Sequence, residues 1–479
     1  MKQRLDPKAF GATMGEPVPL RRVFIAGVGM TKIGEHWDKD LSDLVLEAVV
    51  EASVLSGIER LEVDSFHYGS ALSQLYSRQG NTAALVADRL GLSKMGIPLY
   101  EHGGGSAAGA LALRAAWLDV ASGLADLSVA AAADKMTDLK EVEHLANAGL
   151  EMDSEWEASF GLTPHAAAGL VADAYIQKYG LTREALSLIP SLFHSHAALN
   201  EKAQYQKAIS PEAVSKSLPV ALPLRMFDCA PVSDGAAAVF LASEDFVKYM
   251  TEKIPDSTIL HYPPLELVVV APASQKFNLA YRSDITKDWA TLEAGRKSFE
   301  ACGATVDEVN VVEVHDDYSI YALTALEALG FAPFGMSWKG FQKGLFTIES
   351  ASKGEGPAVN TSGGRKAQGA PRSAIGLTQV YEVALQLWGL AGKRQVKNAK
   401  VGLCQTKSAS SALAVVSILR SYPQVKWPVK EHSITKLKPQ NEPVQPKGTD
   451  NEKKSRQETA SLPGKESPDN KKKKEGGEN

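Results

Sequence analysis

Three cysteines are all that the 479-residue sequence contains, and they lie far apart in the chain. Cys229, Cys302 and Cys404 have neither metal-type spacing nor the number that a disulfide framework needs, which indicates a reducing compartment and no metal site. The sequence also lacks an apolar run of about 18 residues, the length that a membrane span requires. Residues 1–21 contain no apolar core of a signal peptide. We therefore expect a cytoplasmic protein that does not associate with membranes.

Neither sign of charge dominates the composition. The chain has 52 Lys and Arg against 56 Asp and Glu, a net charge of −4, so we expect no nucleic-acid binding. Hydrophobic residues make up 44% of the chain and charged residues 23%, which is typical of a globular protein with a large core.

Aromatic side chains are missing from one end of the sequence. Residues 428–479 contain no Phe, Trp or Tyr and carry the run Lys471–Lys474. Such a segment buries too little apolar surface to offset the entropy lost on ordering, which predicts a disordered tail. A basic anchor for an acidic partner is the alternative function for this tail.

Short, β-branched apolar runs alternate with stretches of helical spacing over most of the sequence. This alternation is the pattern of an α/β protein. It predicts strands at 23–28, 63–68, 127–132, 236–241, 265–271, 309–314, 401–405 and 412–419, with helices at 41–56, 107–122, 290–302, 321–329 and 375–391. The pattern runs twice, which indicates two duplicated halves at residues 22–250 and 251–427 after an N-terminal extension at 1–21. Residues 139–215 interrupt the first half, and we interpret them as an inserted helical loop domain lying over the site.

Several motifs occur in an order that is known from one protein family. They are the segments Ser106–Met136, Asp228–Ala237, Glu313–Tyr318, Glu327–Gly330 and Asn360–Pro371. Together they resemble the sterol-carrier-protein type of thiolase, whose loops read His-Asp-x-Phe, Asn-x-Ser-Gly-Gly and Gly-His-Pro. The short run His102-Gly103-Gly104-Gly105 also resembles a His-x-Gly-Gly-Gly run of the thiolase-fold aldolases of steroid side-chain breakdown.

The resemblance covers about residues 22–421 and carries implications for fold and partners. It implies a thiolase fold, in which two βαβαβαββ halves form a five-layered αβαβα arrangement. It also implies acyl-CoA as substrate without a further cofactor, a homodimer, and a separate zinc-ribbon/OB-fold protein as a partner.

The sequence departs from this family at the residues that perform its acyl transfer. Ser106 stands where the family has its nucleophilic cysteine, and Ala370 stands where the Gly-His-Pro loop has its histidine. The family's Gly-Gly turn near the last strands reads Ser408-Ala409. A helix dipole contributes only about 0.3–1 kcal/mol and does not ionise an alcohol, so a serine nucleophile needs a hydrogen-bonded base. We therefore expect Ser106 to be the N-cap of its helix rather than a nucleophile.

The remaining candidates lie in two loops. His315 is the best catalytic candidate, and Asp317 would share its face on an extended segment and could act as a base. The run His102, Gly103, Gly104 and Gly105 could offer N–H groups to an oxyanion, or simply form a tight strand-to-helix turn. The resemblance adds the substrate-binding positions Tyr318, Asn360, Gly363 and Gly364. His194 and His196 are interpreted as packing or surface residues.

Three functions follow from these residues. The preferred one is enolate chemistry of the aldol or retro-aldol type on an acyl-CoA thioester, without a covalent acyl-enzyme. The second is a non-catalytic acyl-CoA-binding or scaffold subunit. The third is an acyltransferase of the acetyl-CoA acetyltransferase type that uses Ser106.

Overall fold

The computed structural model describes residues 20–58, 63–253 and 257–422, all within one compact unit of the chain. The tail expected at residues 428–479 and nearly all of the extension at 1–21 lie outside these ranges. Within them, no helix is both long enough and apolar enough to cross a membrane.

The first half of the chain supplies five strands of the sheet. They lie in the order β3-β2-β4-β7-β1. Strands β3, β2 and β4 run parallel to one another, and β7 runs antiparallel to both of its neighbours, β4 and β1. Their bounds are β1 (Val23–Met30), β2 (Ser65–Gly69), β3 (Leu99–His102), β4 (Leu127–Asp134) and β7 (Gly235–Ser243). Strands β1, β2, β4 and β7 are buried along their whole length. Burial on both faces explains the mostly apolar or small residues of β1, β4 and β7, whereas β2 also buries His67.

The second half repeats this arrangement. Its strands lie in the order β10-β9-β11-β12-β8 with the same pattern of parallel and antiparallel neighbours. Their bounds are β8 (Leu265–Ser274), β9 (Val311–Val314), β10 (Ala358–Val359), β11 (Val401–Lys407) and β12 (Leu413–Ser421). The identical order confirms the predicted duplication, and a single pairing of Phe24 with Glu266 joins the two sets of strands.

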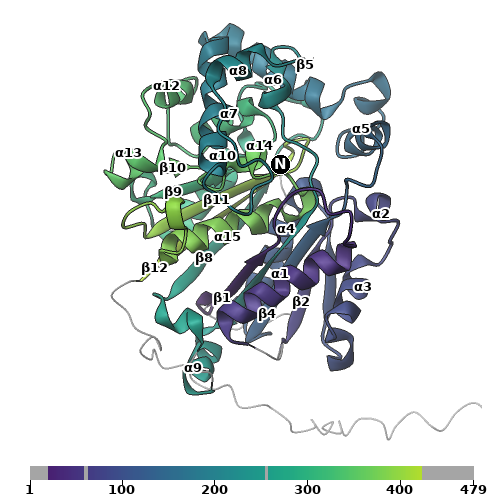
Figure 1. The fold of residues 1–479 in the computed structure, drawn as a ribbon, viewed down its shortest axis with the longest axis vertical. Coiled ribbons are helices and arrows are strands. Elements are labelled where there is room, and N and C mark those ends of the chain that lie inside the picture. Colours follow the sequence, from purple (N-terminus) through teal and green to yellow (C-terminus); the bar gives the residue numbers. More distant parts are fainter. Residues whose placement is uncertain (1–19, 59–62, 254–256, 423–479) are drawn as a thin grey trace, which may run out of the picture. The chain divides into compact units, whose positions relative to one another are not determined.

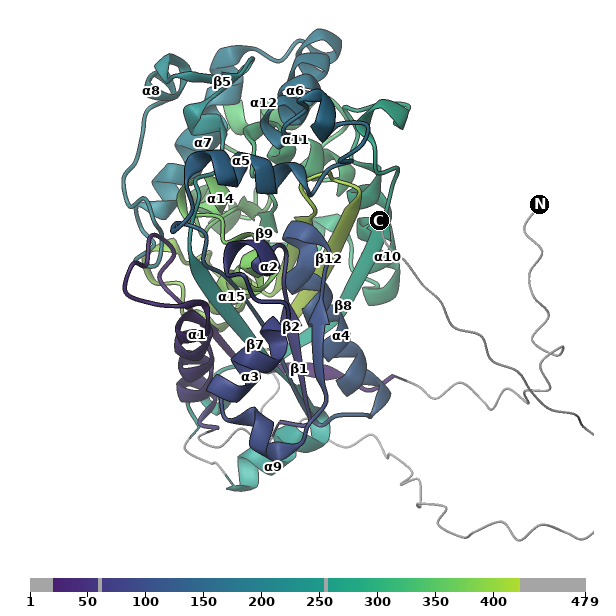
Figure 2. The same cartoon turned by 90° about the vertical axis from the view of Figure 1, so that its right-hand side faces the viewer.

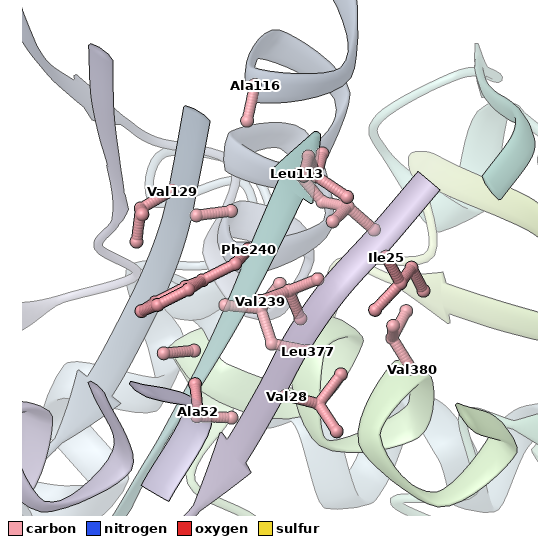
Figure 3. Packing of buried hydrophobic residues seen from close by; sticks show 14 of the residues in the cluster. Ile25, Val28, Ala52, Leu113, Ala116, Val129, Val239, Phe240, Leu377 and Val380 are labelled. Atoms are coloured by element: carbon pink, nitrogen blue, oxygen red, sulfur yellow. The ribbon is translucent and has the colours of Figure 1, made fainter. Parts of the chain in front are cut away.

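Helices cover both sets of strands and separate them. One outer layer is α1 (Leu41–Ser56) with α3 (Thr82–Arg89), and the other is α10 (Trp289–Cys302) with α11 (Ser319–Ala328). Between the two sets of strands lie α4 (Ala108–Ser122) and α15 (Ile375–Trp388), which contact strands of both halves (Figures 1 and 2). This is the predicted five-layered arrangement. Figure 3 shows a side chain of each central helix, Leu113 of α4 and Leu377 of α15, packed beside strands of the first half.

The two central helices approach each other through small residues. A Cβ atom at Gly376 would lie 2.7 Å from the Cβ of Ala110, and one at Gly109 would lie 2.4 Å from the carbonyl oxygen of Ser373. Both distances are shorter than any normal non-bonded contact. The helices therefore meet almost backbone to backbone, which brings the segments before their N-termini together at the site described below.

The insertion is helical, as predicted. Its elements are α5 (Glu141–Gly149), α6 (Pro164–Tyr179), α7 (Arg183–Ala197) and α8 (Pro211–Lys216), followed by a hairpin of β5 (Pro219–Ala221) and β6 (Leu224–Arg225). Thr163, Thr182 and Ser210 cap three of these helices by accepting a hydrogen bond from the third residue that follows. The sequence analysis missed β3, β10 and α3, as well as shorter helices at α2 (Ser73–Tyr76), α9 (Glu244–Lys253), α12 (Ser337–Gln342), α13 (Ile348–Ser352) and α14 (Gly364–Ala367).

Candidate active site

Ser106 lies in a short 3-10 turn, Gly105–Ala107, directly before α4. The residue is fully buried, and both its main-chain N–H and its hydroxyl donate to Oε2 of Glu151, at 3.1 and 3.2 Å. The N-cap of α4 is Ala107, with no side-chain cap. The expectation that Ser106 caps this helix is therefore wrong, because its hydroxyl is turned toward a carboxylate from the insertion.

Glu151 holds together three segments that are distant in the sequence. Its Oε2 also accepts from the N–H of Ala409, at 3.3 Å, and its Oε1 accepts from Arg372, at 3.0 Å. Only 2% of its side chain is exposed. We call the four donors of Ser106 (N–H and hydroxyl), Ala409 and Arg372 the cradle. Gly105, at φ +57°, leaves room for the carboxylate, since a Cβ atom there would lie 2.4 Å from Oε2.

The side chains of His315 and Asp317 form a hydrogen-bonded pair just after β9. Nε2 of His315 lies 3.0 Å from Oδ2 of Asp317, which confirms that the two side chains share a face. Nδ1 of the imidazole accepts a long hydrogen bond, 3.4 Å, from the N–H of Lys407, so Nε2 carries the proton that is donated to Asp317. Both ring nitrogens of His315 are thus engaged inside the protein.

Asp317 has one engaged oxygen and one free oxygen. Oδ1 has no hydrogen-bond partner among the described residues. Burial alone would raise the pKa of this carboxyl, but the hydrogen bond from His315 and the positive charges of Arg372 and Lys366 outweigh burial and hold the pKa well below its ordinary value. Asp317 is therefore ionised near neutral pH, with a proton-accepting oxygen that His315 does not use.

A cavity of about 750 Å³ opens beside Asp317. Its wall includes Asp317, Tyr318, Ala370 and Arg372, together with His144, His165 and Trp37. The methyl group of Ala370 leaves space where the related family has a histidine side chain. His165 packs edge-on against Tyr318, with ring centroids 5.4 Å apart, and its Nδ1 has no partner among the described residues. Burial lowers the pKa of His165 and raises that of Tyr318, so both side chains are neutral near pH 7.

Buried polar residues fix the loop that carries His315 and Asp317. Oδ1 of Asn360 accepts from the N–H of Val314 at 2.7 Å, although Asn360 itself has an unfavourable φ of +49°. The carboxylate of Asp316 accepts from the N–H of Arg365, and a Cβ atom at Gly364 would lie 2.6 Å from its second oxygen. Asn360 and Gly364 therefore position the loop rather than line the cavity.

Two further predicted positions also have packing roles. A Cβ atom at Gly363 would lie 2.5 Å from the Cβ of Ala197 on α7, so this glycine lets the insertion approach the site closely. His196, on the same helix, is buried, and its Nδ1 lies 3.0 Å from the carbonyl oxygen of Asn360. His194 is buried as well, which agrees with the packing interpretation of both histidines.

The structure places His102 away from the cavity wall. Its Nε2 lies 3.0 Å from Nδ1 of His67, whose Nε2 lies 2.9 Å from Asp119. Burial and the neighbouring His67 lower the pKa of His102 to about 4. The oxyanion role predicted for His102 and Gly103 stays a prediction, whereas Gly104 and Gly105 adopt the positive φ angles of a tight strand-to-helix turn.

Fold and site match one family. The model of the thiolase N-terminal domain matches residues 23–218, and that of the thiolase C-terminal domain matches residues 271–421. An acetyl-CoA acetyltransferase of Methanothermobacter thermautotrophicus is 37% identical over 83% of this chain and 99% of its own. The chain belongs to the thiolase superfamily.

The relatives include the sterol-carrier-protein type that the motifs indicated. Human sterol carrier protein 2 is 31% identical over 88% of this chain and 76% of its own length. Among solved structures, the Ltp2-ChsH2(DUF35) aldolase has a TM-score of 0.69 at 24% identity, covering 85% of this chain and 99% of its own, which shows the same fold.

The most connected residues of this thiolase-family site were not predicted from the sequence. Arg372 gave a usable signal, because it directly follows the Gly-Ala-Pro segment in which the family's histidine is missing. Glu151 and His165 lie in the insertion, where no motif marks them. Of the degenerate turn Ser408-Ala409, only Ala409 reaches the cradle, while the hydroxyl of Ser408 pairs with that of Ser410.

Proposed function

We propose that this chain performs enolate chemistry on an acyl-CoA thioester, with Asp317 as the residue that moves the proton. The observation that carries the proposal is an ionised, positioned carboxylate in the wall of a cavity large enough for an acyl group, whose buried Oδ1 has no hydrogen-bond partner among the described residues. Acyl-CoA as the ligand class is supported by the name of the related acetyl-CoA acetyltransferase, and aldol-type chemistry by the name of the aldolase with the same fold.

The proposed reaction is retro-aldol cleavage of a β-hydroxyacyl-CoA. Asp317 takes the proton of the β-hydroxyl group, whose electron pair forms a carbonyl as the bond between the α- and β-carbons breaks. The electrons of that bond form the enolate of the shortened thioester, and the proton returns to its α-carbon. No acyl-enzyme is formed, and the reverse sequence makes the carbon–carbon bond. Arg372, a permanent cation in the cavity wall, is suited to stabilise the enolate oxygen.

His315 is a positioning residue in this proposal. The sequence analysis gave the proton to either His315 or Asp317, and the geometry favours Asp317, because the N–H of His315 already donates to that carboxylate. Replacing His315 with alanine removes the hydrogen-bond donor that helps to lower the pKa of Asp317. We therefore expect the acid limb of the pH–rate profile to move to higher pH, a shift that a purely structural role would not produce.

The geometry gives little support to acyl transfer through Ser106. Glu151 could in principle accept the proton of this serine, since it lies 3.2 Å from the hydroxyl. However, Oε2 of Glu151 takes up the N–H groups of Ser106 and Ala409, which are the donors that a tetrahedral oxyanion on Ser106 would need.

A second candidate is a non-catalytic acyl-CoA-binding or scaffold subunit, which the filled cradle also favours. For either function we propose a cytoplasmic location and a homodimer, with the edge strand β3 available for pairing. A separate zinc-ribbon/OB-fold partner is supported by the aldolase with the same fold, whose name, Ltp2-ChsH2(DUF35), joins two proteins.

The test is cleavage of short-chain and steroid-like β-hydroxyacyl-CoA thioesters, together with deuterium exchange at the α-carbon of acyl-CoA, on protein purified with its native partners. We expect Asp317→Asn to lower both rates by at least about 10²-fold, in the range typical of general-base catalysis, while acyl-CoA binding changes little. Asp307→Asn, an exposed carboxylate in a 3-10 turn, serves as the matched control. If wild-type protein binds acyl-CoA but catalyses neither reaction, the scaffold function holds and the enzyme proposal fails.

A further inference from the structure

The cradle has the geometry of an oxyanion site, and the chain's own carboxylate occupies it. Two main-chain N–H groups and one hydroxyl converge on Oε2 of Glu151 within 3.1–3.3 Å. Donors that converge on one oxygen in a buried place stabilise negative charge on that oxygen, whether it belongs to a carboxylate or to a thioester. The same donors cannot serve both at once.

The three donor segments come from different parts of the fold. Ser106 precedes α4, Ala409 lies in the turn between β11 and β12, and Arg372 precedes α15. Glu151 belongs to the insertion and lies 45 residues from Ser106 and 258 residues from Ala409 in the chain. A buried N–H group that loses its partner keeps the full cost of its desolvation. When Glu151 leaves the cradle, another acceptor must therefore enter it.

Arg372 connects the cradle to the cavity. One nitrogen of its guanidinium holds Oε1 of Glu151, and the same side chain forms part of the cavity wall. Ser106 and Glu151 do not line the cavity. The pair of Arg372 and Glu151 thus lies between the space that admits a ligand and the donors that could bind its oxygen.

We propose that Glu151 is a displaceable internal ligand, so that a thioester oxygen enters the cradle only after Oε2 of Glu151 leaves it. The proposal rests on acyl-CoA as the ligand of the proposed function. Arg372 keeps Glu151 attached through Oε1 while Oε2 exchanges with the oxygen of the acyl group. In the resting protein the acyl group gains nothing from the cradle, and binding of coenzyme A depends on the rest of the molecule.

The first experiment compares acetyl-CoA with free coenzyme A by calorimetry, using wild type, Glu151→Ala and Glu151→Gln. We expect equal affinities for the two ligands in wild type. In Glu151→Ala, acetyl-CoA should bind about tenfold tighter than coenzyme A, because two N–H groups gain an acceptor. In Glu151→Gln, which keeps one acceptor oxygen, the preference for acetyl-CoA should lie between that of wild type and that of Glu151→Ala. Glu157→Gln is the matched control, since Glu157 is also buried in the insertion but accepts from Leu279 and Asp153 instead.

The second experiment uses formate as a probe and does not depend on coenzyme A. Formate should raise the melting temperature of Glu151→Ala by several degrees at millimolar concentration, while chloride at the same ionic strength should not, and wild type should not respond. The proposal is overturned if the ratio of the affinity for acetyl-CoA to the affinity for coenzyme A is the same in wild type and in all variants, even if formate binds. Failure of every variant to bind either coenzyme A ligand overturns the acyl-CoA function itself, and a formate response then identifies the cradle as a carboxylate site only.

Discussion

Replacing Gly376 with alanine tests whether the close approach of the two central helices holds the site together. The added Cβ would lie 2.7 Å from the Cβ and 2.8 Å from the main-chain nitrogen of Ala110. Since carbon atoms prefer separations of about 3.5–4.0 Å, α4 and α15 would have to move apart by about 1 Å. Overpacking of this kind costs about 1–3 kcal/mol, against which alanine gains up to about 1 kcal/mol over glycine in helix propensity.

A comparison with Gly149→Ala separates these two effects. Gly149 is also helical, at the end of α5, but its added Cβ would make an ordinary contact of 3.4 Å with Ala158. We expect Gly376→Ala to be less stable than Gly149→Ala by about 1–3 kcal/mol. Urea unfolding followed by circular dichroism measures this as a lower midpoint at an unchanged slope. If Gly376→Ala is as stable as Gly149→Ala, the helices are not in the tight contact described, and the argument for the convergence of Ser106 and Arg372 fails.

Three further predictions concern buried polar groups. Incubation with acetyl-CoA should leave the intact mass of the protein unchanged, and a stoichiometric adduct that is lost in Ser106→Ala would restore the acyltransferase hypothesis. Burial raises the pKa of Asp134 to about 7, so the unfolded chain releases this proton first, and stability should fall as the pH rises from about 4 to 7. In Asp134→Asn, urea unfolding at pH 5 and pH 8 should show that this part of the loss of stability is gone. If the difference in stability between the two pH values is the same as in wild type, the prediction is contradicted. Glu382→Ala leaves Arg394 buried without its carboxylate and should cost about 3–5 kcal/mol, whereas a loss below 1 kcal/mol would show that water reaches this pair.

Much of the site's framework could be predicted because it depends on local rules. Side chains two residues apart on an extended segment share a face, so spacing alone predicted that His315 and Asp317 lie on the same side of their loop. The glycines at 104 and 105 marked a tight turn because positive φ angles favour glycine. The strands and long helices were visible because burial imposes a hydrophobic period on the sequence. Short elements such as β3 and β10 were missed, since two to four residues carry no such period.

The sequence by itself determined the family, the duplicated α/β halves, the loss of the nucleophile and its histidine, and the shared face of His315 and Asp317. Only the tertiary structure decided where the carboxylate of Glu151 lies and which residues besides Ser106 donate hydrogen bonds to it. The tertiary structure also decided that His102 turns toward His67 instead of the cavity. The physical reason is that these contacts join side chains from separate elements, where no helical or strand period relates one residue to the other. Their partners are chosen by the packing of the insertion over the two central helices, and the unmet hydrogen-bonding needs of buried N–H groups fix the result.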